Sequence, residues 1–181
     1  PSDWASFDQV IDDLRRVVDP SLRLPSWPFR ASMGHARFCQ FSLAIEGPFG
    51  AVLHALADDG GDERVSVAVL EPSPDYYRAN YGSFPVFTLS HHEIVQEYWH
   101  AVSHEPEGDP TGSIAYTANA VCITGSTGTW AVWAERAWDL AIVLSKDANG
   151  SWESVGVKFV DAETALADFT EPEFKTPLSN N

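Results

Sequence analysis

Residues 114–160 read IAYTANAVCITGSTGTWAVWAERAWDLAIVLSKDANGSWESVGVKFV. Three clusters of turn-forming residues interrupt this stretch, at positions 125–128, 135–136 and 147–150. The segments between the turns are rich in Val, Ile, Trp and Ala, which is a composition typical of strands. The stretch therefore predicts a C-terminal four-stranded antiparallel meander over about residues 114–160.

The turns also predict a register for this meander. Pairing across the third turn places Ile142 opposite Val155, and the second turn places Trp133 opposite Trp138. These residues then share one apolar face, together with Ala131. A slip of one residue would move each of them to the other face, so the agreement between separate turns supports the register.

The opposite face of the meander has two interpretations. It carries Trp130, and it places Asp139 across from Lys158, with Trp152 at its flank. One interpretation is a second packed layer, built from the first half of the chain, with an ion pair at its rim. The other is an exposed apolar platform that binds a protein partner, with Trp130 as its anchor.

Helices are expected to pack on this sheet. Apolar residues spaced by three and four predict an amphipathic N-terminal helix over residues 4–18. The capping box Ser90-x-x-Glu93 predicts a central helix to about residue 103, and Asp161-x-x-Thr164 a short C-terminal one. The expected fold is α+β, with a single domain over residues 1–170 and a loosely ordered tail over residues 171–181.

The rest of the chain is expected to contribute further strands and turns. Residues 35–45, 65–69 and 84–89 have the patterns of extended segments. Residues 48–57 fit either a short helix or a strand, and residues 72–82 fit a tyrosine-bearing turn or a short helix.

The chain is strongly acidic, with 11 basic and 26 acidic residues, a net charge of −15 and a pI near 4.5. This balance argues against binding to nucleic acids, which requires Lys and Arg, and against docking on anionic membranes. A negative surface favours fast association with a basic protein. Our first hypothesis is a non-catalytic, protein-binding domain of the immunity or inhibitor type. Its contact residues are predicted to be Asp58, Asp59, Asp62, Trp130, Asp139 and Trp152.

Composition also suggests an origin and a compartment. Lysine occurs only three times while alanine is abundant, which indicates a GC-rich bacterial gene. Cys39 and Cys122 fit no metal or redox spacing, so we expect buried free thiols in a bacterial cytoplasm. A single long-range disulfide in an exported protein is the alternative. No apolar run approaches the roughly 18 residues that a membrane span needs.

The second hypothesis is a metal-dependent hydrolase or a metal-binding domain that uses a divalent transition metal. Histidines gather on the central helix, where His92, Glu97, His100 and His104 offer ligand atoms at helical spacing. The spacing lacks the glutamate of a His-Glu-x-x-His motif, so a solvated helix face is the competing interpretation. Because no nucleophile or other catalytic set is evident, the first hypothesis, a non-catalytic protein without a cofactor, is favoured over a metal-dependent enzyme.

The third hypothesis is a small-ligand binding domain. It places a pocket between the meander and the segment that carries Tyr76, Tyr77 and Tyr81.

Overall fold

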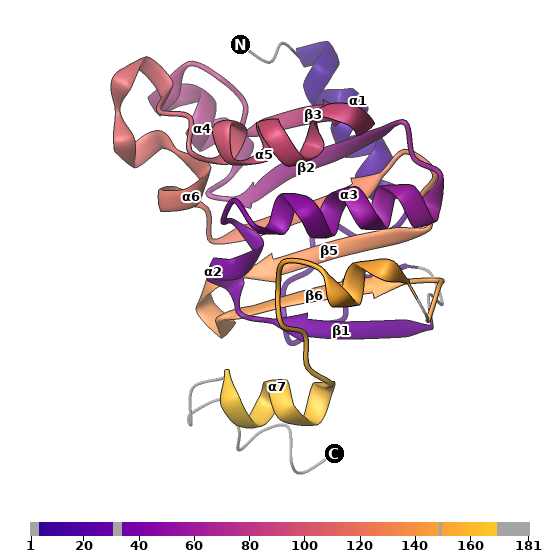
Figure 1. Cartoon of the computed structure of the whole chain (residues 1–181). Helices are drawn as coiled ribbons and strands as arrows, with labels where there is room; N and C mark the ends of the chain where they lie inside the picture. The colour runs from indigo at the N-terminus through magenta and orange to yellow at the C-terminus, as the bar shows by residue number, and fades with distance from the viewer. Residues whose placement is uncertain (1–3, 31–33, 149, 170–181) are drawn as a thin grey trace.

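The computed structural model describes residues 4–30, 34–148 and 150–169 of the chain. Within these ranges, six strands form one antiparallel sheet in the order β1–β6–β5–β4–β2–β3 (Figure 1). The strands are β1 (His35–Cys39), β2 (Arg64–Glu71), β3 (Val86–Ser90), β4 (Ala120–Gly125), β5 (Trp130–Glu135) and β6 (Leu140–Ser145). The α-helices are α1 (Trp4–Arg15), α2 (Phe41–Ala44), α3 (Phe49–Gly60), α4 (Pro74–Tyr81), α5 (Ile94–Val102), α6 (Ile114–Thr117) and α7 (Ala162–Asp168). The predicted α+β class is confirmed.

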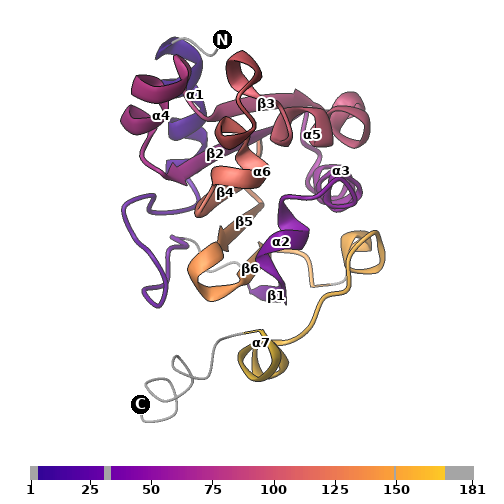
Figure 2. The ribbon, with the colours of Figure 1, turned by 90° about the vertical axis from the view of Figure 1, so that its left-hand side faces the viewer.

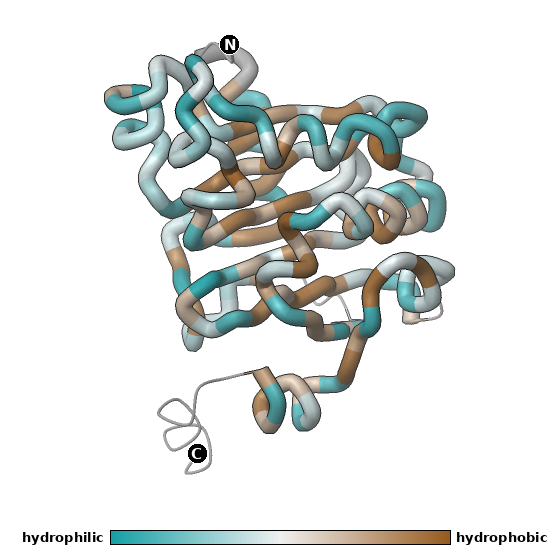
Figure 3. Tube along the Cα trace, turned by 60° about the vertical axis from the view of Figure 1, so that its left-hand side comes forward, coloured by the Kyte–Doolittle hydropathy of each residue, from teal (hydrophilic) through white to brown (hydrophobic). Residues whose placement is uncertain are grey.

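Helices cover both faces of the sheet. Figure 2 shows α3 and α5 on one side of the strands and α1 on the other, while α7 lies beyond β1 at the sheet edge. Because both faces are covered, every residue of β4, β5 and β6 is buried. The apolar residues follow the strands and the polar ones follow the outer helices (Figure 3).

The two apolar faces of β5 pack in different layers. Trp130 and Val132 face the layer of α3 and α5, whereas Ala131 and Trp133 face the layer of α1. The predicted grouping of Ala131, Trp133, Trp138 and Ile142 on one face is therefore confirmed, whereas Val155, predicted for the same face, packs in the opposite layer.

The predicted register across the second turn is wrong. Trp133 pairs with Ile142, not with Trp138. The connection is longer than a two-residue turn, because Arg136–Trp138 form a 3₁₀ turn and Asp139 then takes the left-handed conformation, with φ of 45°.

The predicted fourth strand of the meander is also wrong. The edge of β6 that it was expected to occupy pairs with β1, where Phe38 lies opposite Ile142. Ser151–Ser154 instead form a 3₁₀ turn, η5, and in the described part of the chain after it the backbone pairs with the sheet at Val160, which bridges to Phe38. Glu153 of this turn accepts a hydrogen bond from Arg37 Nε at 2.8 Å, which ties η5 to β1. The first predicted strand is likewise shortened, because residues 114–117 form α6.

The predictions for the other segments and for the helix caps were confirmed only in part. The strand expected over residues 35–45 ends at Cys39, and Phe41–Ala44 turn into α2. The ambiguous residues 48–57 belong to α3, and residues 72–82 contain α4. The predicted cap at Asp161 forms, with Asp161 accepting the backbone N–H of Thr164 at 2.8 Å. The capping box predicted at Ser90 does not form, because the Ser90 hydroxyl donates to the Glu93 carboxylate and caps no backbone N–H.

Several acidic residues are structural. Asp13 accepts hydrogen bonds from Arg64 at 2.9 Å and Ser66 at 3.2 Å, which ties α1 to β2. Glu135 accepts the Trp133 indole N–H at 2.7 Å and the Leu24 backbone N–H at 2.8 Å. Both carboxylates are buried, so their charges are compensated inside the fold.

Cys39 and Cys122 are buried free thiols, as expected. Among the described residues, no helix combines the length and the apolar character needed to cross a bilayer. The tail over residues 171–181 lies outside the described part of the chain.

Candidate functional site

The layer of α3 and α5 carries the exposed surface with the most distinctive chemistry. The inner face of α5 buries Ile94, Tyr98 and Val102 against α3. The two helices approach closely at Gly50, where a Cβ atom would lie only 3.3 Å from Tyr98 Cβ. Tyr98 is fully enclosed, and its hydroxyl donates to the carbonyl oxygen of Ala44. These contacts fix the orientation of α5, and with it the outer face of the helix.

That outer face presents two large apolar side chains to solvent. Val95 and Trp99 lie one helical turn apart and are 48% and 46% exposed. Trp99 rests on the chain at Gly47, where an added Cβ would be 3.5 Å from Trp99 Cβ. Tryptophan side chains are buried on average, and an exposed one on a well-packed helix is typical of a residue that anchors a partner.

Acidic residues are exposed on the same helix and beside it. Glu93 and Glu97 are exposed on η1 (His91–Glu93) and on α5, and Glu46 is exposed beside Gly47. The chain contains no Lys or Arg between residues 38 and 63 or between residues 79 and 135. The fold packs α3 and α5, one from each of these stretches, side by side (Figure 1).

Positive charge is concentrated elsewhere and is largely paired. Six arginines form ion pairs with acidic residues, namely Arg15, Arg16, Arg23, Arg30, Arg37 and Arg64. Lys146 lines a hollow together with Asp59, at the far end of α3. The acidic surface is therefore that of α5 and its flanks. We call it the acidic α5 face, made of Glu46, Glu93, Val95, Glu97 and Trp99.

The aromatic residues predicted to contact a partner are in the core. Trp130 and Trp152 are 1% and 0% exposed, so the expected exposed platform is absent, and the alternative of a second packed layer holds. Trp130 is buried because α3 and η5 cover this side of the sheet, and Trp152 is the residue that η5 itself buries in this layer. Asp139 lies in the β5–β6 connection and accepts a hydrogen bond from Gln40. The predicted pairing of Asp139 with Lys158 is wrong, because the strand expected to carry Lys158 does not form.

The three predicted acidic contacts separate into different environments. Asp62 is only 4% exposed and accepts the indole N–H of Trp130 at 2.7 Å, so it belongs to the core. Asp59 is exposed and accepts the backbone N–H of Ser151 at 2.9 Å. Asp58 is exposed as well, and it lies between two histidines.

The predicted metal ligands do not converge. His92 is 81% exposed and its nearest acidic partner is Glu93, at 4.0 Å. His104 lies beyond the last residue of α5, and it lines an open hollow with Glu97 and His100. Throughout the described ranges, the group whose ligand atoms all lie within 4.8 Å of one another is instead His54, Asp58 and His91.

This cluster combines two distant segments. His54 and Asp58 are one turn apart on α3, with Nδ1 and Oδ2 separated by 3.2 Å. His91 begins η1, and its Nε2 lies 2.7 Å from Asp58 Oδ1. The spacing His54-x-x-x-Asp58 was visible in the sequence, but it has meaning only on a helix, and this segment was ambiguous between helix and strand.

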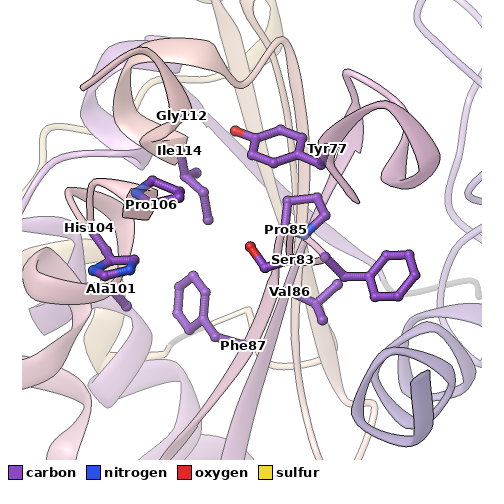
Figure 4. A pocket seen from close by; sticks show the side chains of 11 residues that line it. Tyr77, Ser83, Pro85, Val86, Phe87, Ala101, His104, Pro106, Gly112 and Ile114 are labelled. Atoms are coloured by element: carbon purple, nitrogen blue, oxygen red, sulfur yellow. The ribbon is translucent and has the colours of Figure 1, made fainter. Parts of the chain in front are cut away.

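A cavity of about 240 Å³ opens beside the end of α5. Figure 4 shows Tyr77, Ser83, Phe87, His104 and Ile114 around its centre. Tyr77 is 2% exposed, and its hydroxyl has no hydrogen-bond partner. Burial raises the pKa of Tyr77 to about 12. The neighbouring Thr117 side chain lowers the pKa of Tyr77, by less than burial raises it. The Thr117 hydroxyl itself donates to the carbonyl oxygen of Thr111.

The cavity differs from the predicted one in its walls. The tyrosine segment contributes Tyr77, but the other side is formed by β3, the end of α5 and α6 instead of the meander. No known protein family, curated protein or solved structure matches this chain.

Proposed function

We propose that this protein binds a basic protein partner through the acidic α5 face, as an inhibitor of the immunity type does. The observation that carries the proposal is Trp99, which is 46% exposed on a rigidly packed helix whose solvent-exposed side also carries Glu93 and Glu97. Tryptophan is the residue type most enriched at the energetic centre of protein interfaces. The carboxylates of the acidic α5 face favour a partner rich in Lys and Arg.

Each component has a separate physical role. The indole supplies apolar area and a face on which an arginine of the partner can stack. The carboxylates attract the basic partner over distances of about a Debye length, so they mainly raise the association rate. A salt-dependent association rate and a Trp99-dependent dissociation rate are the expected signature.

The test uses defined basic proteins, namely the products of neighbouring genes with a pI above about 9, each purified and measured by biolayer interferometry. We expect one of them to bind, with an affinity that falls at least about tenfold between 50 and 300 mM salt. Trp99→Ala is expected to weaken binding at least about 30-fold, which corresponds to roughly 2 kcal/mol.

Trp27→Ala is the matched control, because Trp27 is 50% exposed and lies in the segment between α1 and β1, outside the acidic α5 face. It should leave binding unchanged. Poly-lysine serves as a charge-only probe, whose binding should respond to salt and not to Trp99→Ala. Equal effects of the two tryptophan variants, or the absence of any binding at low salt across the panel, would overturn the proposal.

A second candidate function is the binding of a small, largely apolar ligand in the cavity beside α5. The unpartnered hydroxyl of Tyr77 supports it, because a buried polar group without a partner is destabilising unless a ligand or water satisfies it. The ligand would carry one hydrogen-bond acceptor for Tyr77. A fragment screen by NMR should find ligands whose preference for an acceptor disappears in Tyr77→Phe and persists in Tyr76→Phe, since Tyr76 lies outside the cavity. Identical ligand preferences in both variants would count against this function.

A further inference from the structure

The cluster of His54, Asp58 and His91 has the composition of a metal site. Two imidazole nitrogens face the two oxygens of a single carboxylate, at 3.2 Å and 2.7 Å. The imidazole rings lie together, with centroids 4.7 Å apart and planes inclined by 35°. Nitrogen and oxygen ligands of this kind, two histidines and one carboxylate, are those of many zinc and other transition-metal centres.

The distances suit one shared cation. A tetrahedral Zn²⁺ has bonds of about 2.0–2.2 Å to nitrogen and oxygen, which places its ligand atoms roughly 3.3–3.6 Å from one another. The three ligand atoms of the cluster all lie within 4.8 Å of one another, so small side-chain rotations bring them to that separation. A bound cation would take the place of the protons that the imidazole nitrogens share with the carboxylate.

The backbone holds the ligands from two sides. His54 and Asp58 are fixed at one-turn spacing by α3, whose inner face is buried in the core. The backbone N–H of His91 donates to the carbonyl oxygen of Glu63 at 2.9 Å, which anchors η1 beside the end of α3. His54 and His91 are 35% and 34% exposed at their side chains, so solvent can supply a fourth ligand.

We propose that His54, Asp58 and His91 bind one divalent transition-metal ion, with Zn²⁺ as the expected ion and water completing its coordination. The exposed acids Asp59 and Glu63 flank the site in sequence and add negative potential without occupying it. A metal bound here links α3 to the start of the segment that carries α5. The proposal stands independently of partner binding, because its ligands lie outside the acidic α5 face.

The test is a titration of untagged, chelator-treated full-length protein with Zn²⁺, followed by calorimetry. We expect one ion per chain, and an affinity that falls by at least about tenfold in His54→Ala and in His91→Ala, because loss of a ligand exceeds the effect of losing an outer-shell partner. Co²⁺ gives a second readout, through visible absorption bands that report a nitrogen- and oxygen-ligated centre and that should vanish in both variants.

His92→Ala and His100→Ala are the matched controls, since both residues are exposed histidines outside the cluster. They should bind Zn²⁺ like the wild type. Zn²⁺ should also raise the melting temperature of the wild type and of the controls, but not that of His54→Ala. Circular dichroism of the metal-free variants verifies that each is folded before titration.

Three results would overturn the proposal. One is the absence of Zn²⁺ binding by folded wild-type protein. Another is an unchanged affinity in His54→Ala and His91→Ala. The third is a loss of binding confined to His100→Ala, which would move the site to the hollow lined by Glu97, His100 and His104.

Discussion

The carboxylate of Asp62 accepts the indole N–H of Trp130 at 2.7 Å in the interior of the protein. Its other oxygen accepts the backbone N–H of Thr127 at 2.6 Å and the hydroxyl of Thr127 at 2.8 Å. Asp62 therefore joins the turn after α3 to the hairpin between β4 and β5. A buried carboxylate with several donors stabilises the fold only while all of them are present.

Asp62→Ala should destabilise the protein by about 2–4 kcal/mol, because it leaves the buried Trp130 indole N–H without an acceptor and removes the two hydrogen bonds from Thr127. Asp59→Ala is the control, since Asp59 is exposed and caps only the start of η5. Urea denaturation followed by tryptophan fluorescence gives both free energies of unfolding. Equal, small losses in the two variants would contradict a structural role for Asp62.

Gly125→Ala should be destabilising for the same reason. A Cβ at this position would lie 2.1 Å from Asp62 Oδ2, so the carboxylate would have to leave its donors. A double-mutant cycle with Asp62→Ala should therefore show strong non-additivity, of about 1–3 kcal/mol. Additive losses would mean that Gly125 acts through contacts other than Asp62.

Trp99→Ala should change the free energy of unfolding by less than about 1 kcal/mol, because the side chain is about half exposed and surface substitutions have small effects. Trp133→Ala should cost about 3–5 kcal/mol, since Trp133 is fully buried in the layer that faces α1. Thermal and urea unfolding of the two variants measure the difference. A large loss in Trp99→Ala would show that this residue is needed for folding, and would weaken its assignment to a binding surface.

Both thiols should be unreactive in the folded protein. Burial raises the pKa of Cys39 to about 12 and that of Cys122 further still, so neither forms the thiolate that reacts with alkylating agents. At pH 8 a disulfide reagent should label neither cysteine in buffer and both in concentrated urea. Rapid labelling of either cysteine under native conditions would contradict their burial.

The same shifts predict alkaline destabilisation. The unfolded chain releases its thiol protons near pH 9.0, whereas the folded protein retains the proton of Cys39 up to about pH 12. The contribution of the two thiols to the free energy of unfolding should therefore be constant below about pH 9 and fall as the pH rises toward 12, by up to about 1.4 kcal/mol per pH unit for each buried thiol. Urea midpoints between pH 8 and pH 11 test this, and Cys39→Ala should make the decline shallower.

The sequence predicted the elements whose signals are local. The strands β4, β5 and β6 follow from their apolar runs and from the turns between them, and α7 follows from its cap at Asp161. These local signals did not determine the register between β5 and β6. The turn at Glu135 looks like a two-residue hairpin, but the chain adds a 3₁₀ turn and a left-handed residue at Asp139.

The candidate sites were less predictable than the fold. Trp130 and Trp152 are of the residue type that anchors interfaces, and only the packing of α3 and η5 on this side of the sheet makes them core residues. The sequence spacing of Trp99 predicts that it belongs to the apolar stripe of the central helix, together with Ile94 and Tyr98. The structure turns it outward, since α5 buries the neighbouring positions Ile94 and Tyr98.

The sequence by itself determined the secondary structure of the sheet's centre, the amphipathic helices and the excess of negative charge. Tertiary structure decided that β1, 100 residues earlier in the chain, and not the segment after β6, completes the sheet beside β6. It also decided that His91 meets His54 and Asp58. Periodicity and turn residues act over a few positions, whereas strand partners and side-chain clusters depend on which distant surfaces bury each other best.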